Sequence, residues 1–479
     1  MSTENPSTPP APPSRPAPRW QSKLSRMIEF LGLRRSIVGL LSMVILVGMG
    51  EHMAEQFLPL YLLALGGGFI SVGFLNGMDN LLGALYSLPG GYLSDRLGTK
   101  RALLIFNLAS MVGFLIVVLI PSWPAVLGGA VLFLSWTAIS LPATMSLVAR
   151  VLPKNKRTMG VSIHSLVRRV PMALGPIIGG LLISGWGNLF GTSLTFHGFG
   201  LELGVRLAFA GALAMAIIAA VLQQALIEDD RKSPQDRAAA TAAPPAEHNP
   251  LALWKLMSPP LRRLLVADIL VRFCEQIPYA FVVIWAIGTA HTSGYVSAFQ
   301  FGVLRTIEMA TAILIYIPVA YFADKSQKKP FVVATFAFFT AFPLMLLVSK
   351  SFIMLALAFV LRGLKEFGEP TRKALIMDLA PEDRKAGMFG LYYLIRDVIV
   401  SVAAFGGAFL WRASPELNLW TAFAFGAAGT LWFAFFGRNI AAATPPAAAG
   451  AGRDRGKRRI RSRAEVTEDA EKKRFKKRN

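Results

Sequence analysis

Cysteine is almost absent from this sequence, and charged residues are scarce. The single cysteine, Cys274, lies inside an apolar run, which excludes disulfides within the chain and a cysteine-ligated zinc site. Asp, Glu, Lys and Arg make up 16% of the residues, against about 25% in soluble domains. The chain has no Gly-x4-Gly-Lys-Ser/Thr loop and no His-Glu-x-x-His motif, and its five histidines are scattered. We therefore expect no cofactor, no metal site and no use of ATP.

Apolar residues, in contrast, account for 54% of the chain, and the mean hydropathy is +0.49. They form runs of about 20 residues, the length of an α-helix that crosses a bilayer. The runs lack period-2 alternation, which excludes an outer-membrane barrel, and the short loops between them exclude an ordinary cytosolic enzyme. The expected fold is an all-α membrane protein with twelve transmembrane helices, at residues 36–64, 71–93, 101–121, 124–150, 159–186, 203–226, 263–290, 296–323, 331–349, 352–377, 386–411 and 417–438.

Positive charge is unevenly distributed around these runs. The net charge is +22, and Lys and Arg gather in the N-terminal segment and in every second loop after it. Cytoplasmic loops of membrane proteins are enriched in these residues. We therefore expect a multi-pass protein of the plasma (inner) membrane with both termini in the cytoplasm.

The chain divides into two similar halves and three flanking segments. Residues 1–35 are expected to form a disordered Pro-rich arm and an interfacial helix, residues 228–258 a cytoplasmic linker, and residues 441–479 a basic tail near anionic lipid rather than nucleic acid. The halves, 36–227 and 259–440, match each other at an offset of about 228 residues, as expected of parallel repeats. The offset places Asp79 opposite Glu308 and Arg168 opposite Arg396, and the stretch 55–59 resembles 275–278.

The stretch Gly-Tyr-Leu-Ser-Asp-Arg-Leu-Gly-Thr-Lys-Arg at residues 91–101 resembles the loop 2–3 signature of the major facilitator superfamily, and residues 320–329 hold a degenerate second copy. The resemblance implies two pseudo-symmetric six-helix halves and secondary transport by alternating access. It also implies that Asp95 stabilises the outward-facing state near the N-terminus of helix 11, where a helix dipole favours an anion. The gating residues implied by the motif are Gly91, Asp95, Arg96, Gly98, Lys100, Arg101 and Asp324.

A second motif lies in the fifth predicted helix. Its residues Gly175, Pro176, Gly179 and Gly180 are similar to part of the antiporter signature of the same family, which favours export. The alternative is that these small residues only allow close helix packing. The fourth helix also lacks the mid-membrane arginine that drug:proton exporters of the family carry.

Ionisable residues inside the predicted helices need a function or a partner, because each costs about 2.5–3.5 kcal/mol to insert into a membrane. The candidates for proton coupling are Glu55, Glu51, Asp79, Glu308 and Glu275. The candidates for substrate binding are Arg168, Arg396, Arg305 and Arg272, with Arg168 and Arg396 as a symmetric pair that would hold an anion. The alternative for several of them is static pairing along one helix. The tenth helix carries a charged stripe from Arg362 to Lys373 that must face water or the other half.

These observations favour proton-coupled export of a small organic solute by a monomeric, non-enzymatic antiporter, with the solute, protons and the lipid bilayer as partners. Two alternatives stay open. One is proton-coupled uptake of an organic anion, and the other is a sensor or lipid-handling protein that uses the same scaffold without transport.

Overall fold

A computed structural model shows the chain to be almost entirely helical. It describes residues 35–134, 136, 140, 144, 157–185, 197–227, 250–289, 292–324, 327–381 and 385–438. The predicted N-terminal arm, most of the linker and the basic tail lie outside these residues. Within them, strand structure is limited to β1 (Gly288–Thr289) and β2 (Thr292–Ser293), a short antiparallel pair.

Helices coincide with the apolar runs of the sequence. The first half contains α2 (Arg35–Glu55), α3 (Leu58–Ala64), α4 (Gly68–Leu97), α5 (Thr99–Leu119), α6 (Trp123–Phe133), α8 (Arg157–Ser184) and α9 (Leu201–Leu226). The second half follows the short α11 (Pro250–Leu256) and contains α12 (Pro259–Gln276), η2 (Tyr279–Phe281), α13 (Val282–Ile287), α14 (Ala298–Asp324), α15 (Lys328–Val348), α16 (Phe352–Gly363), η3 (Leu364–Gly368), α17 (Glu369–Leu379), α18 (Lys385–Ala413) and α19 (Pro415–Phe436). In the described part of the chain, nine segments are long and apolar enough to cross a membrane.

Three of the predicted membrane helices are interrupted. The first breaks between α2 and α3, where Pro59 lies in the first turn of α3. The seventh breaks after α12, where Pro278 cannot donate a backbone hydrogen bond and the turn η2 follows. These two breaks fall in the stretches that the repeat aligns. The tenth helix is divided into α16, η3 and α17.

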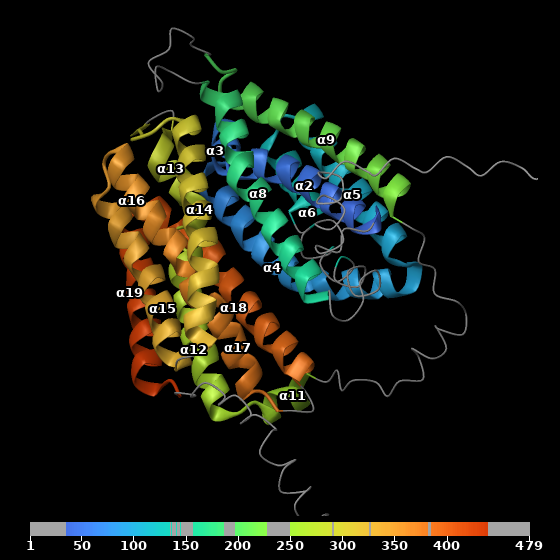
Figure 1. The fold of residues 1–479 in the computed structure, drawn as a ribbon. Helices are drawn as coiled ribbons and strands as arrows, with labels where there is room; N and C mark the ends of the chain where they lie inside the picture. The colour runs from blue at the N-terminus through green and yellow to red at the C-terminus, as the bar shows by residue number, and fades with distance from the viewer. Residues whose placement is uncertain are drawn as a thin grey trace, which may run out of the picture.

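The two halves meet along two helix pairs, α4 with α18 and α8 with α14 (Figure 1). Small residues let the backbones approach closely. A Cβ atom on Gly180 would lie 2.3 Å from the carbonyl oxygen of Ala298, and one on Gly302 would lie 2.4 Å from that of Pro176. In Figure 1 the halves approach each other at the end that carries α3 and α13 and lean apart toward the end that carries α11.

The outer surface of the bundle is apolar. Phe435 and Leu314 are each 76% exposed, and Ile353 is 72% exposed. A protein surrounded by water rarely exposes a large continuous apolar surface, whereas lipid chains cover one without cost. The exposed apolar side chains of α14, α16 and α19 therefore form a surface suited to a bilayer.

Candidate functional site

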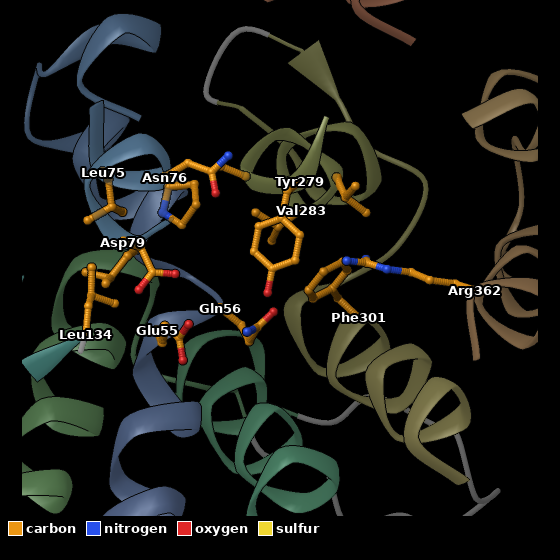
Figure 2. Close-up of a pocket in the computed structure, with 14 residues that line it drawn as sticks. Glu55, Gln56, Leu75, Asn76, Asp79, Leu134, Tyr279, Val283, Phe301 and Arg362 are labelled. Carbon is orange, nitrogen blue, oxygen red and sulfur yellow. The ribbon is translucent and has the colours of Figure 1, made fainter. Parts of the chain in front are cut away.

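A cavity lies between the two halves, next to the interruptions in the first and seventh helices (Figure 2). It encloses about 520 Å³, part of it open to solvent. Its lining is mainly apolar with a few polar groups, which is typical of a site for a small organic molecule. The lining residues are Glu55, Gln56, Leu58, Pro59, Leu75, Asn76, Asp79, Leu134, Tyr279, Ala280, Val282, Val283, Phe301 and Arg362.

Hydrogen bonds between the halves support the break in the seventh helix. The side-chain amide of Asn76 on α4 donates to the backbone carbonyl of Gln276 at 3.0 Å. Asn80, one turn further along α4, donates to the side-chain oxygen of Gln276 at 3.1 Å. A carbonyl at a helix end needs such a partner when it is buried. The polar residues beside the cavity thus connect the two halves at the point where α12 ends.

The first half contributes an acidic wall to the cavity. Glu55 and Asp79 line the cavity, and Glu51 lies one turn before Glu55 on α2. Nδ1 of His52 lies 3.0 Å from Oε2 of Glu55. Glu51 is 5% exposed, and its Oε2 atom has no hydrogen-bond partner in the described part of the structure. Such an oxygen is costly to bury as a charged group and much less costly in a neutral carboxylic acid.

Arg168 is the cation that the structure brings near these acids. It lies on α8, is half-buried and interacts electrostatically with Glu51. Three acids, Glu51, Glu55 and Asp79, therefore lie near this one arginine. The balance on this side of the cavity is negative.

The second half carries a dense network of ion pairs instead. Three cations surround the buried carboxylate of Glu308: Arg305 Nη1 at 2.5 Å, Arg362 Nε at 3.3 Å and Lys365 Nζ at 3.5 Å. Lys365 Nζ also lies 2.8 Å from Glu275 Oε1, and Arg272 Nη1 lies 2.6 Å from Glu275 Oε2. Glu308 and Glu275 are thus strongly paired, unlike Glu51.

A second part of the network centres on Asp268 in α12. This carboxylate is 1% exposed and pairs with Arg372, which is equally buried. The hydroxyl of Tyr392 donates to Asp268 at 3.0 Å, and Arg396 Nη1 lies 3.6 Å away. Glu369 also accepts from Arg372, at 2.7 Å. These pairs connect α12, α17 and α18.

One described ion pair joins the network to the first half. Arg169 Nη2 on α8 lies 3.3 Å from Glu366 Oε2 in η3. Glu366 directly follows Lys365, so neighbouring residues of η3 contact opposite halves of the protein. This segment is where the predicted tenth helix is interrupted.

The predicted substrate-binding arginines all lie close to the network or the acids. Arg272 and Arg305 pair with Glu275 and Glu308, and Arg396 pairs with its neighbour Asp397 at 2.7 Å. None of them, and not Arg168, is among the residues that line the cavity. The arginine that does line it is Arg362, the first residue of the charged stripe predicted in the tenth helix. Its position in the middle of an apolar run was the available signal.

The predicted gating motif is described only in part. Gly98 precedes α5 with a φ of +86°, which suits glycine. Lys100 Nζ donates to the carbonyl of Gln224 at 2.8 Å, and Arg101 is exposed. Gly91, Asp95 and Arg96 lie in α4 and Asp324 ends α14, but their side chains lie outside the described part.

The glycines of the fifth predicted helix face neighbouring helices. A Cβ atom on Gly179 would lie 1.8 Å from the carbonyl oxygen of Met53, and one on Gly175 would lie 2.9 Å from His52, both on α2. Gly180 contacts α14, as does Pro176. Close packing of α8 against α2 and α14 therefore requires Gly175, Gly179 and Gly180.

The described residues contain no group of three or more His, Cys, Asp or Glu side chains arranged to hold a metal ion. What they define is a helical membrane protein with two halves and a cavity between them. The sequence matches the profile of the Major Facilitator Superfamily over residues 40–304. The chain belongs to this family and is a membrane transporter.

Two curated relatives are similar to this chain at low sequence identity. The chain is 25% identical over 343 residues to the "Minor myo-inositol transporter IolF" of Bacillus subtilis (strain 168), a match that covers 68% of this chain and 72% of that protein. It is 28% identical over 163 residues to the "Methylenomycin A resistance protein" of Streptomyces coelicolor (strain ATCC BAA-471 / A3(2) / M145), covering 30% and 33%.

Solved structures confirm the fold at low identity. The nucleoside transporter NupG (D323A mutant) aligns with a TM-score of 0.66 at 11% identity and covers 84% of this chain and 99% of that one. The peptide transporter POT in complex with sulfate aligns with a TM-score of 0.62 at 16% identity, covering 83% and 93%.

Proposed function

We propose that this chain is a secondary active transporter that exchanges protons for a small organic solute by alternating access. The carrying observation is the surplus of carboxyl groups on the first-half wall of the cavity, where Glu55 and Asp79 face the space that a solute would occupy. A group that binds either a proton or a cationic solute can couple the two movements, because each ligand displaces the other. Glu51, whose Oε2 has no hydrogen-bond partner in the part of the chain that the structure describes, is the third member of this site.

Competition for the same carboxyls favours exchange over cotransport. When protons enter from the acidic side, they neutralise Glu55 and Asp79 and release a bound cation. When the cation binds from the other side, it releases the protons. Under an inward proton gradient this cycle exports the solute, which is the direction that the partial antiporter motif at 175–180 also favours. The strongly paired Glu275 and Glu308 are less suited to this exchange than Glu55 and Asp79.

We further propose that the protein lies in the plasma (inner) membrane and crosses it twelve times, with both termini in the cytoplasm. The crossings form two halves, 36–227 and 259–440, and residues 228–258 link them. Basic residues support this orientation. Arg262 and Arg263 begin α12, Lys100 and Arg101 begin α5, and Lys328 begins α15, each after an even number of crossings. A single chain encloses the whole cavity, which supports a monomer as the working unit.

Transport assays in proteoliposomes test the exchange. Vesicles with an acidic lumen and a trapped pH dye receive quaternary ammonium probes, tetramethylammonium and choline among them, which cannot cross a bilayer in a neutral form. We expect the lumen to become more alkaline with the wild-type protein and not with Glu55→Gln or Asp79→Asn.

Glu416→Gln is the matched control, because Glu416 lies in the exposed first turn of α19. It should exchange as the wild type does. Entry of labelled probe without any change in the pH of the lumen would contradict proton exchange.

A further inference from the structure

We propose that the solute carried in this cavity is a zwitterion, with a cationic end held by Glu55 and Asp79 and an anionic end, such as a carboxylate, held by Arg362. The inference rests on the proposed function, because it names the class of solute that competes with protons at the same acids. It depends on a separate residue, Arg362, and on the distribution of charge across the cavity.

Arg362 is buried, charged and incompletely paired. It is 5% exposed, and its Nε atom lies 3.3 Å from Glu308 Oε1. In the described part of the structure, that contact is its only ion pair, and no hydrogen bond is made by its Nη1 and Nη2 atoms. A guanidinium carries five N–H donors, so the outer four are available to an acceptor. These donors match the two oxygens of a carboxylate.

The surroundings hold Arg362 toward the cavity. Its guanidinium carbon lies over the rings of Phe342, Tyr279 and Phe359, at 5.0, 5.4 and 5.8 Å from their centroids. Stacked rings restrict a guanidinium to a defined orientation. Figure 2 shows Arg362 reaching in from one side, Glu55 and Asp79 on the other, and Tyr279 and Gln56 between them.

The two walls also differ in net charge. Glu308 is shared by three cations, Arg305, Arg362 and Lys365. Lys365 also pairs with Glu275, so these three cations share two carboxylates and one positive charge remains on this wall. On the opposite wall Glu55 and Asp79 line the cavity, and no cation of the first half is among the described lining residues.

This asymmetry favours a zwitterion over ions of a single sign, which bind more weakly. A simple cation bound at the acids would face Arg362 across the cavity, and a simple anion bound at Arg362 would face two carboxylates. Repulsion of this kind is strong in a low dielectric. A zwitterion satisfies both walls, and its carbon skeleton contacts the apolar lining from Leu58, Leu75 and Phe301.

Equilibrium calorimetry on the full chain in detergent tests the inference without membrane permeation. The probes are alanine, 4-aminobutyrate and 6-aminohexanoate, which differ in the separation of their charges. Each is compared with its carboxamide, which lacks the anion, and with its N-acetyl form, which lacks the cation. Repeating each titration in two buffers of different ionisation enthalpy gives the number of protons released.

For at least one length, we expect the free amino acid to bind the wild-type protein about tenfold more tightly than its carboxamide or N-acetyl form, as one charge-assisted contact supplies. Arg362→Gln should remove the preference for the free acid over the carboxamide while retaining binding of the carboxamide. Arg362→Lys should keep part of the preference that Arg362→Gln loses. Arg412→Gln, at the exposed end of α18, is the control and should behave as wild type.

Three results would overturn the zwitterion: equal binding of the free acids and carboxamides to the wild type, a preference unchanged in Arg362→Gln, or no binding of any free acid. The proposed proton exchange is judged separately. Tight binding of a free acid without proton release would contradict the exchange and leave the zwitterion site intact. Proton release on binding of the carboxamides alone would contradict the zwitterion site and support the exchange.

Discussion

Replacing Asp268 by Asn should destabilise the second half strongly, because this carboxylate is the shared partner of a buried cluster. Asp268 and Arg372 are each 1% exposed, and Tyr392 and Arg396 also face the same carboxylate oxygen. Removing one member of a buried ion pair costs about 3–5 kcal/mol. At roughly 2–4 °C per kcal/mol for a unit of this size, the melting temperature in detergent should fall by roughly 6–20 °C.

Two comparisons make the measurement decisive. Asp378→Asn removes an acid that is 38% exposed and pairs with Lys328 at 2.5 Å, and an exposed pair contributes only about 0–1 kcal/mol. The double variant Asp268→Asn with Arg372→Gln removes both charges and should recover part of the loss. The buried pairing would be contradicted if the melting temperature of Asp268→Asn lay within about 2 °C of the wild-type value. It would also be contradicted if Asp378→Asn lowered the melting temperature as much as Asp268→Asn does.

Further substitutions test packing, gating and the alternative anion site. Gly179→Ala should destabilise the protein by about 1–3 kcal/mol through overpacking, since its Cβ would lie 1.8 Å from the carbonyl oxygen of Met53. Gly128→Ala, with open space around it, should not destabilise the protein. Equal melting temperatures of the two variants would contradict the packing of α8 on α2. Asp95→Asn should lower transport far more than expression, and near-normal flux would remove its gating assignment. Arg396→Lys should lower the melting temperature without changing the apparent KM, because Arg396 already pairs with Asp397; a raised KM in both Arg396→Lys and Arg168→Lys would instead support the symmetric anion clamp.

The interrupted helices illustrate how far sequence reasoning reaches. The repeat aligned residues 55–59 with 275–278, and the structure breaks the first and seventh helices in those stretches. Proline explains why a helix stops there. What the pattern did not reveal is that both breaks adjoin the same cavity, because that depends on how the halves face each other.

The charged residues show the same limit. Spacing along one helix predicted that Arg305 could pair with Glu308 and Arg272 with Glu275, and both pairs are present. Lys365 and Arg362, more than 50 positions away from Glu308, complete the network. Contacts between residues so distant in sequence leave no periodic signal.

Composition and local pattern by themselves determined that this is a membrane protein and where its described apolar helices lie, since these follow from transfer free energies of consecutive side chains. They also revealed its family motif. Tertiary structure alone decided which ionisable groups are neutralised and which remain available. Asp268, Glu275 and Glu51 are all acids inside apolar runs. The first two are enclosed by cations, whereas Glu51 has an oxygen without a hydrogen-bond partner among the described residues. The reason is that electrostatic energy in a low dielectric depends on distances of a few ångströms between helices, which only their packing sets.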